Sequence, residues 1–399
     1  MTLLQLALSR AGYATLKDFQ RNNGLYPSGM PDILTVQMLE PYFFGYRRHL
    51  IMPGDTFETL AQKFDTSVRA ISAANPELDP LRLIPGQYLT VPLGFSVVPT
   101  QVPFSSQVLQ VTIQGLMARY PFLTQRILTT TDYGRPVPCL ICGSGERIIS
   151  YNASHHANEW ITTPVLLRFL EEYCSAYIRN ETIFDYPAQE LFRRCTLYLV
   201  PMVNPDGVDL VTGNLSPDSF EYRQARNLAK NYPQIPFPDG WKANLNGVDL
   251  NLNYPAGWEQ AQEIKFAQGY TLPGPRDFVG NAPLDQPESA AMVALTQEID
   301  PALTIAYHTQ GQVIYWKYLD MEPPGAREIG EEFARVSGYI LEDTPYASGF
   351  AGYKDWFILT YNRPGYTIEV GIGENPLPLS QFEEIYRHNL GILTLGLAL

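Results

Sequence analysis

The sequence predicts an α/β protein in which a small βααβ module precedes a much larger domain. Beyond residue 105, short apolar runs typical of strands alternate with helical patterns such as Thr162–Tyr177. The runs are Arg147–Tyr151, Thr196–Met202, Ala302–Tyr307 and Tyr366–Val370. This alternation is typical of a sheet with helices on both faces. Before it, residues 46–94 hold two short strand patterns that flank two short helical patterns.

The chain has 399 residues, which is more than one average domain contains. We therefore divide it into a small helical region at 1–45, the module at 46–94, a linker at 95–104 and the large domain at 105–399. The linker is rich in proline and valine and has no helical or strand periodicity.

The formal net charge of -13 excludes several classes of partner. Such a surface repels nucleic acid and anionic membranes, and no block of Lys and Arg reverses this locally. We therefore expect no nucleic-acid or membrane partner. The first residues lack a basic leader and no apolar segment has the length needed to cross a bilayer, so the expected location is cytoplasmic, without a signal peptide.

Four cysteines are scattered without the spacing of a disulfide framework. Cys139 and Cys142 could form a redox or zinc pair, but an extended backbone would point them to opposite faces. We expect buried free thiols.

The helical region begins with two predicted helices, Leu3–Ala11 and Thr15–Asn23, which are followed by turns containing glycine and proline. Within it, Phe19–Leu25 weakly resembles part of a helical peptidoglycan-binding domain.

In the βααβ module, the expected strands are His49–Met52 and Tyr88–Pro92. Asp55, with Glu58 three residues later, predicts a capping box at the start of the first helix. Asn75-Pro76 ends the second helix.

The module resembles a LysM domain through Pro53-Gly54-Asp55-Thr56, Asn75-Pro76, Pro85-Gly86-Gln87 and Val91-Pro92. The resemblance implies binding to glycans that contain N-acetylglucosamine, chiefly bacterial peptidoglycan. The alternative is a structural unit that has lost its ligand.

His156 and Glu159 stand three residues apart just after a predicted strand, which is the spacing of a chelating pair. His308 can supply a third ligand, and two histidines with one glutamate form a known zinc set for peptide hydrolysis. A His-x-x-Glu pair alone often arises by chance. The spacing to Glu159 selects His156 over the adjacent His155.

Polar side chains follow several predicted strands: His156, Asn204 and His308 come after strands, and Glu369 lies at the end of one. In open α/β sheets the ligand crevice lies at the carboxyl ends of the strands. These distant residues are therefore expected to converge on one site.

Four further motifs strengthen the metal hypothesis, and together they resemble the zinc carboxypeptidase family over about the last three hundred residues. They are Asn204-Pro205-Asp206-Gly207, Gly247-Val248-Asp249-Leu250-Asn251, Tyr307-His308-Thr309 and Tyr366-Thr367-Ile368-Glu369-Val370. The resemblance implies a mixed eight-stranded sheet flanked by helices, with one Zn²⁺ per chain held by His156, Glu159 and His308.

The resemblance also implies roles for other residues. Glu369 matches the catalytic glutamate that takes a proton from the activated water, although Glu374 competes and a strand carboxylate at a surface edge is the structural alternative. Lys242 best matches the cation that stabilises the oxyanion, with an exposed loop lysine as its alternative and Arg223 or Arg226 as substitutes. Tyr346 falls near the tyrosine that covers bound substrate.

Two positions depart from the digestive members of the family. Leu252 follows Asn251 where those enzymes carry an arginine that grips the substrate's terminal carboxylate together with the asparagine. Asn158 likewise replaces an arginine that contacts extended peptides. With a LysM-like module, this pattern resembles bacterial γ-D-glutamyl-diamino acid peptidases. Lys354, expected to be exposed, lies near the position that tunes the leaving-residue pocket.

We therefore expect a zinc metallopeptidase that hydrolyses the γ-D-glutamyl-diaminopimelate bond of peptidoglycan stem peptides and acts at the spore or cell wall. The alternatives are a broad metallocarboxypeptidase that accepts ordinary peptides and a wall-binding pseudoenzyme.

Overall fold

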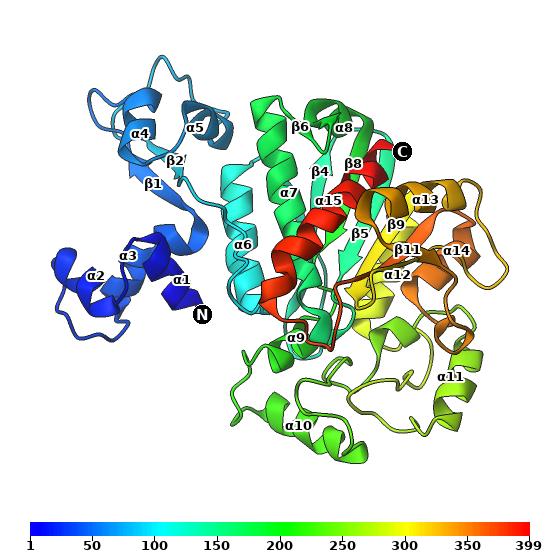
Figure 1. Ribbon diagram of the computed structural model, residues 1–399. Helices are drawn as coiled ribbons and strands as arrows, with labels where there is room; N and C mark the ends of the chain where they lie inside the picture. The colour runs from blue at the N-terminus through cyan, green and yellow to red at the C-terminus, as the bar shows by residue number, and fades with distance from the viewer.

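The computed structural model describes all residues 1–399, with two small N-terminal lobes beside one large domain (Figure 1). The first lobe holds three helices: α1 Leu3–Arg10, α2 Leu16–Asn22 and α3 Ile33–Phe44. The first two were expected, but α3 was not. It contains Pro41, and Ile33 and Leu34 are exposed, so its sequence lacks a clear amphipathic pattern.

The second lobe is the expected βααβ unit, with β1 Tyr46–Leu50, α4 Phe57–Lys63, α5 Val68–Ala74 and β2 Tyr88–Pro92. Its two strands pair antiparallel over a small core of its own. The predicted first strand was placed three residues too late, and the predicted cap was wrong by one residue. Thr56 caps α4 together with Thr59, while the Asp55 carboxylate accepts from Met52 N and contacts His49.

The large domain is built on a mixed eight-stranded sheet, as predicted, with strand order β11-β10-β12-β9-β5-β8-β4-β3. The four central strands β12, β9, β5 and β8 run parallel. The strands are β3 Thr124–Thr130, β4 Pro136–Gly143, β5 Arg147–Ala153, β8 Cys195–Val200, β9 Leu303–Thr309, β10 Val313–Tyr315, β11 Ile340–Glu342 and β12 Gly365–Val370.

A small ribbon and fifteen further helical segments complete this domain. The ribbon is β6 Thr182–Ile183 with β7 Tyr186–Pro187. The α-helices are α6 Ser106–Arg119, α7 Thr162–Arg179, α8 Ala188–Arg194, α9 Pro205–Val211, α10 Phe220–Leu228, α11 Trp258–Ala267, α12 Pro287–Ile299, α13 Ala326–Ser337, α14 Tyr353–Tyr361 and α15 Phe382–Ala398. The 3₁₀ turns are η1 Ala157–Glu159, η2 Ala229–Asn231, η3 Leu250–Leu252, η4 Tyr346–Ser348 and η5 Leu379–Gln381. No helix combines the length and apolar character that a membrane crossing requires.

Each face of the sheet is covered by helices, and each has its own hydrophobic core. The larger core packs α6, α7, α13 and α15 on one face, and the other packs α11, α12 and α14 on the opposite face. Cys142 belongs to the first core and Cys139 to the second, because successive residues of β4 point to opposite faces. All four cysteines are buried and free, as expected.

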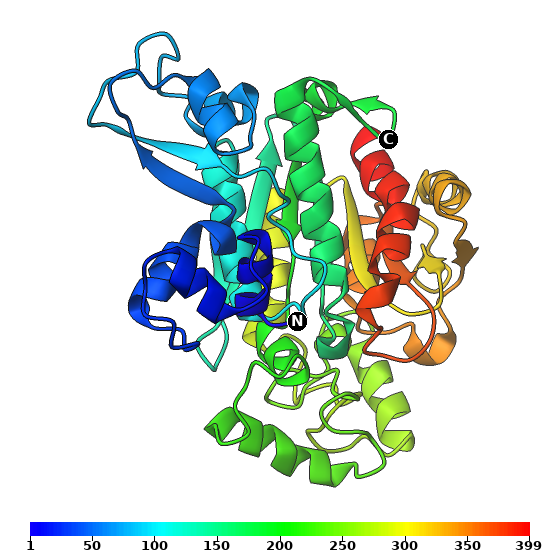
Figure 2. The same cartoon turned by 60° about the vertical axis from the view of Figure 1, so that its left-hand side comes forward.

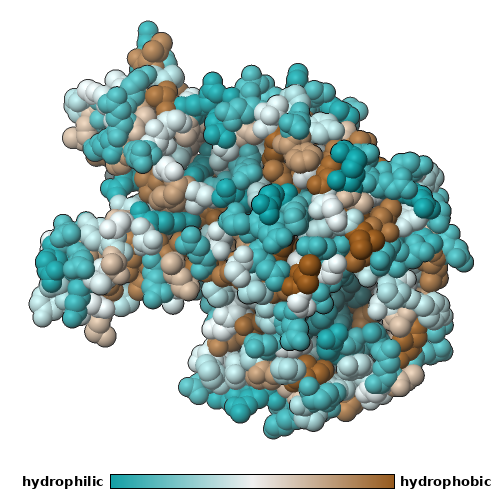
Figure 3. All heavy atoms as spheres, viewed as in Figure 1, coloured by the Kyte–Doolittle hydropathy of each residue, from teal (hydrophilic) through white to brown (hydrophobic).

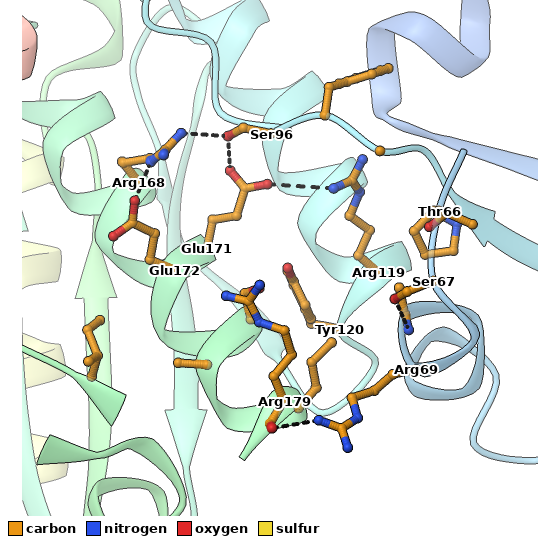
Figure 4. A pocket seen from close by; sticks show the side chains of 18 of the residues that line it. Thr66, Ser67, Arg69, Ser96, Arg119, Tyr120, Arg168, Glu171, Glu172 and Arg179 are labelled. Carbon is orange, nitrogen blue, oxygen red and sulfur yellow. Dashed lines mark hydrogen bonds and ion pairs between the residues drawn. The ribbon is translucent and has the colours of Figure 1, made fainter. Parts of the chain in front are cut away.

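Figure 2 shows the two N-terminal lobes beside the large domain. A buried ionic network joins both lobes to that domain, and part of it is drawn in Figure 4. Glu171 of α7 accepts from the Val97 and Val98 amides of the linker and lies 3.7 Å from Arg119 of α6. Arg119 donates to Gly45 O and Leu93 O at the two ends of the βααβ unit. Arg10 of α1 donates to Ser96 O and Val97 O. The lobes are therefore fixed at a defined orientation.

Replacing Glu171 with alanine should loosen this junction. The substitution leaves Arg119 buried without its charge partner, which typically costs about 3–5 kcal/mol. We expect a lower midpoint of thermal unfolding and faster proteolytic cleavage in the 95–104 linker. Glu190→Ala removes an exposed ion pair and should cost less than about 1 kcal/mol. Equal protease resistance of the Glu171→Ala and wild-type proteins would contradict the claim that Glu171 holds the two lobes against the large domain.

Candidate metal centre and active site

The three predicted ligands come together at the carboxyl ends of neighbouring strands. His156 and Glu159 follow β5, and His308 lies near the end of β9, which pairs parallel with β5. His156 Nδ1 lies 3.0 Å from Glu159 Oε1 and 3.3 Å from His308 Nδ1, and His308 Nδ1 lies 2.9 Å from Glu159 Oε2. Three potential ligand groups thus converge on one point.

The local backbone explains how the turn after β5 brings His156 and Glu159 together. Ser154 adopts φ +53°, an uncommon conformation for a side chain with a Cβ, and its hydroxyl contacts Thr162 and Thr163 of α7. The 3₁₀ turn η1 then carries Glu159 back to His156. Asn204 caps α9 and donates to His155 O and Ala243 O, which ties this turn to the loop that carries Lys242.

The donor set fits zinc. Ligands about 2.0–2.1 Å from a tetrahedral zinc lie about 3.3–3.4 Å from one another, close to the separations found here. His156 also directs Nε2 at Asp249 Oδ1, 3.0 Å away, which leaves Nδ1 as the metal-facing nitrogen. A carboxylate in this position orients a ligating histidine and raises its basicity.

Charges around the cluster shift the ionisation of its members. Burial lowers the pKa of His156, but Glu159 and Asp249 outweigh burial and raise that pKa to about 9. Burial lowers the pKa of His308. Burial raises the pKa of Glu159, but His156 and Lys242 hold it well below its usual range. The Glu159 carboxylate is therefore ionised.

His155 is not part of the cluster, as the three-residue spacing between His156 and Glu159 predicted. Its side chain is completely buried and its Nε2 lies 2.9 Å from Tyr254 Oη. Burial holds the pKa of His155 well below its usual range. It is a neutral packing histidine.

Glu369 lies at the carboxyl end of β12, in register with His308 on the adjacent parallel strand β9. The edge-strand alternative is wrong, because β12 lies between β9 and β10. Residues in register on neighbouring strands point to the same face, so Glu369 faces the metal cluster. Burial and the Glu159 carboxylate raise the pKa of Glu369 to about 8. Glu374 lies beyond the strand, outside the cavity lining.

Lys242 is not an exposed loop lysine. Its Nζ lies 3.0 Å from Glu159 Oε1 with the side chain 17% exposed, and Ala157 N donates to its carbonyl oxygen. Burial lowers the pKa of Lys242, but Glu159 outweighs that effect and raises it. The alternatives Arg223 and Arg226 are exposed on α10, and neither lines the cavity.

A cavity of about 240 Å³ opens over the cluster. Besides His156, His308, Lys242 and Glu369, its wall includes Asp249, Asn251, Leu252, Lys265, Arg276, Asp277, Tyr315, Lys354 and Asp355. The expectation that Lys354 is exposed was wrong. Its side chain is 4% exposed, and it contacts Asp355 and donates to Lys317 O and Thr344 Oγ1.

Of the four predicted substrate-binding residues, two line the cavity and two do not. Asn251 and Leu252 line the cavity, and Asn251 Oδ1 accepts from Tyr353 N, which leaves its amide nitrogen free. Tyr346 is 65% exposed on η4 and packs edge-on against Phe350, outside the cavity lining. Asn158 is buried, donates to Asp239 O and also lies outside the lining.

Sequence reasoning gave no role to three residues that the structure brings to this site: Lys265, Arg276 and Asp277. Asp249 was identified only as part of a motif. The Gly-Val-Asp spacing could have indicated Asp249, whereas no strand end or spacing marks the 272–281 loop.

The chain belongs to the zinc carboxypeptidase family, whose model matches residues 109–391, and a LysM domain model matches residues 49–92. It is 46% identical over 287 residues to gamma-D-glutamyl-L-diamino acid endopeptidase 1 of Lysinibacillus sphaericus, covering 72% of this chain and 70% of that protein. It is 41% identical over 283 residues to uncharacterized protein YqgT of Bacillus subtilis, covering 70% of this chain and 73% of that protein.

Among solved structures, carboxypeptidase A from Helicoverpa armigera matches with a TM-score of 0.55 and 18% identity, over 85% of this chain and 78% of that one. This likeness shows the fold. Family membership makes the chain a zinc-peptidase-type hydrolase and favours this class over the wall-binding pseudoenzyme.

The ligand set predicts the effect of three substitutions on metal content. His308→Ala and His156→Ala should each abolish stoichiometric zinc binding, because two ligands remain. Asp249→Asn should weaken zinc affinity about 10- to 100-fold through the lost orientation of His156. Zinc content by plasma mass spectrometry, with chelator competition for affinity, measures both effects. His388→Ala serves as the control, and a His308→Ala protein with one tight zinc would contradict the assignment.

Proposed function

We propose that this protein is a zinc-dependent peptidase that hydrolyses the bond between γ-D-glutamate and diaminopimelate in peptidoglycan stem peptides. One observation carries the proposal: a two-histidine, one-glutamate cluster opens into a cavity whose wall has Leu252, which offers no donor to a terminal carboxylate. The 46% identity to a protein named as a γ-D-glutamyl-L-diamino acid endopeptidase supports the substrate class.

In this proposal His156, Glu159 and His308 hold one zinc ion. Zinc at such a site supplies a Lewis acid that lowers the pKa of a water molecule and polarises a carbonyl. Glu369 takes the proton from the attacking water and passes it to the leaving amine. A carboxylate suits both steps, because its ionised form accepts a proton and its protonated form gives that proton back.

Lys242 places a positive charge beside the cluster, where negative charge develops on the carbonyl oxygen of the substrate. Such fixed charge stabilises the transition state more than the ground state. Asn251, with its free amide nitrogen, supplies a donor for the leaving diamino acid. The three donors of Lys354 are taken by Asp355, Lys317 O and Thr344 Oγ1, so it fixes the cavity wall. Tyr346, from the exposed turn η4, would close over bound substrate.

The βααβ lobe suits the wall polymer itself. LysM domains bind peptidoglycan or chitin-like glycans, and here the polymer is proposed to be the N-acetylglucosamine-containing peptidoglycan strand. Met52, Leu81 and Ile84 are exposed on the loops after β1 and before β2, and apolar residues are visible at the tip of this lobe in Figure 3. Action at the spore or cell wall stays a prediction.

The proposed reaction is tested by incubating L-alanyl-γ-D-glutamyl-diaminopimelate with the protein and analysing products by mass spectrometry. Free diaminopimelate should appear, and a zinc chelator should abolish its release. Glu369→Gln, which keeps the size of the side chain, should lower kcat by about 10²–10⁴-fold while zinc content stays at one per chain. Full activity of Glu369→Gln would contradict its role, and no cleavage of this or longer stem peptides would contradict the substrate.

Glycan binding is tested separately with a Leu81→Asp and Ile84→Asp double variant of the full chain. It should bind sedimented, protein-free peptidoglycan at least about tenfold more weakly while cleaving the soluble tripeptide at the wild-type rate. Val68→Asp, on the exposed surface of α5, is the control. Unchanged sedimentation of the double variant would contradict this surface.

A further inference from the structure

Arg276 shares its carboxylate partner with another cation of the cavity wall. Lys242 faces Glu159, Lys354 faces Asp355, and Lys265 faces Asp277 at 2.6 Å with both side chains 11% exposed. Asp277 therefore already has a buried partner when Arg276 Nε makes a second contact with it at 2.6 Å. One carboxylate thus serves two cations.

The guanidinium is held in place at one edge and is free at the other. Its only polar contact within the protein is from Nε to Asp277 Oδ2, so the two terminal nitrogens have no partner. The side chain is 39% exposed and lines the cavity together with His156 and Lys242. An arginine in this state presents a pair of parallel donors of the geometry that binds a carboxylate.

The loop that carries Arg276 is fastened to the metal site. Pro275 O accepts from Lys242 N at 2.7 Å and from Ala243 N at 2.9 Å. Asp277 N donates to Asp249 Oδ2, the carboxylate that also contacts His156. Asp277 itself has φ +66°, a costly backbone conformation that persists only where the surrounding structure enforces it. Arg276 is therefore preorganised relative to the metal ligands.

We propose that Arg276 is a specificity-determining residue that binds a carboxylate of the substrate next to the scissile bond. This inference rests on the proposed function, because the stem peptide carries such groups: the α-carboxylate of γ-linked D-glutamate and the carboxylates of diaminopimelate. Arg276 thereby supplies, from a different loop, the paired donors that Leu252 cannot offer. Lys265 and Asp277 are positioning residues for it.

Kinetics of Arg276→Gln on the zinc-loaded full chain test the proposal. For L-alanyl-γ-D-glutamyl-diaminopimelate, KM should rise about 10- to 100-fold with kcat changed less than about threefold, since the lost contact is present in both ground and transition states. Arg276→Lys should recover part of the loss, because charge returns without the fork. Arg335→Gln, which removes an exposed arginine that pairs with Glu332, should behave as wild type.

Substrate analogues identify the carboxylate. One analogue carries D-isoglutamine, which lacks the α-carboxylate, a second carries lysine, which lacks the distal carboxylate, and a third carries a C-terminal amide. The effect of Arg276→Gln should vanish for the analogue that lacks the group bound by Arg276 and persist for the others. A substitution effect of equal size on all three analogues would overturn the proposal in favour of a structural role.

Binding separates this inference from the proposed reaction. Calorimetry of the tripeptide with zinc-loaded Glu369→Gln, with and without Arg276→Gln, requires no turnover. Weaker binding with Arg276→Gln supports carboxylate binding by Arg276 even if the wild-type protein cleaves nothing. An absence of cleavage would overturn the proposed function alone. Equal binding by the two proteins, or none by either, would overturn carboxylate binding by Arg276 even if diaminopimelate is released.

Discussion

The buried carboxylate of Glu159 is the constraint around which the active-site region is arranged. Its side chain is 1% exposed, and a buried charge is tolerated only when partners surround it. His156, His308, Lys242 and the Thr309 amide all contact it. These partners come from a strand end, an adjacent strand and a distant loop, so satisfying one carboxylate brings three separated parts of the chain together.

A second set of contacts holds in place the residues that surround Glu159. Asp249 orients His156 and accepts from the Asp277 amide, while Asn204 holds the backbone of the His155 turn and of the Lys242 loop. The cavity wall is consequently rich in paired charges. A cavity of this kind discriminates between substrates through the number and position of their carboxylates, because each unpaired charge that enters it must find a partner.

Much of the fold and the convergence of the candidate metal cluster could be predicted from the sequence, because buried strands and their polar ends leave strong patterns. The four strands predicted in the large domain agree with β5, β8, β9 and β12 within about two residues. The N-cap of α4 was predicted one residue too early, because the Asp55 carboxylate contacts Met52 N and His49 and does not cap the helix. The burial of Lys354 and the position of Arg276 depend on loop packing between residues distant in sequence, which no local pattern encodes.

The central claim is that a buried zinc-ligand cluster opens into a cavity adapted to stem-peptide carboxylates and not to ordinary C-termini. A competition experiment tests it most directly: the zinc-loaded protein is given equal amounts of L-alanyl-γ-D-glutamyl-diaminopimelate and an unmodified α-linked tripeptide, and both products are followed by mass spectrometry. The account predicts a kcat/KM ratio of at least about 100 in favour of the stem peptide, the equivalent of one or two charge-assisted contacts. A ratio near one, or a preference for the α-linked peptide, would contradict it.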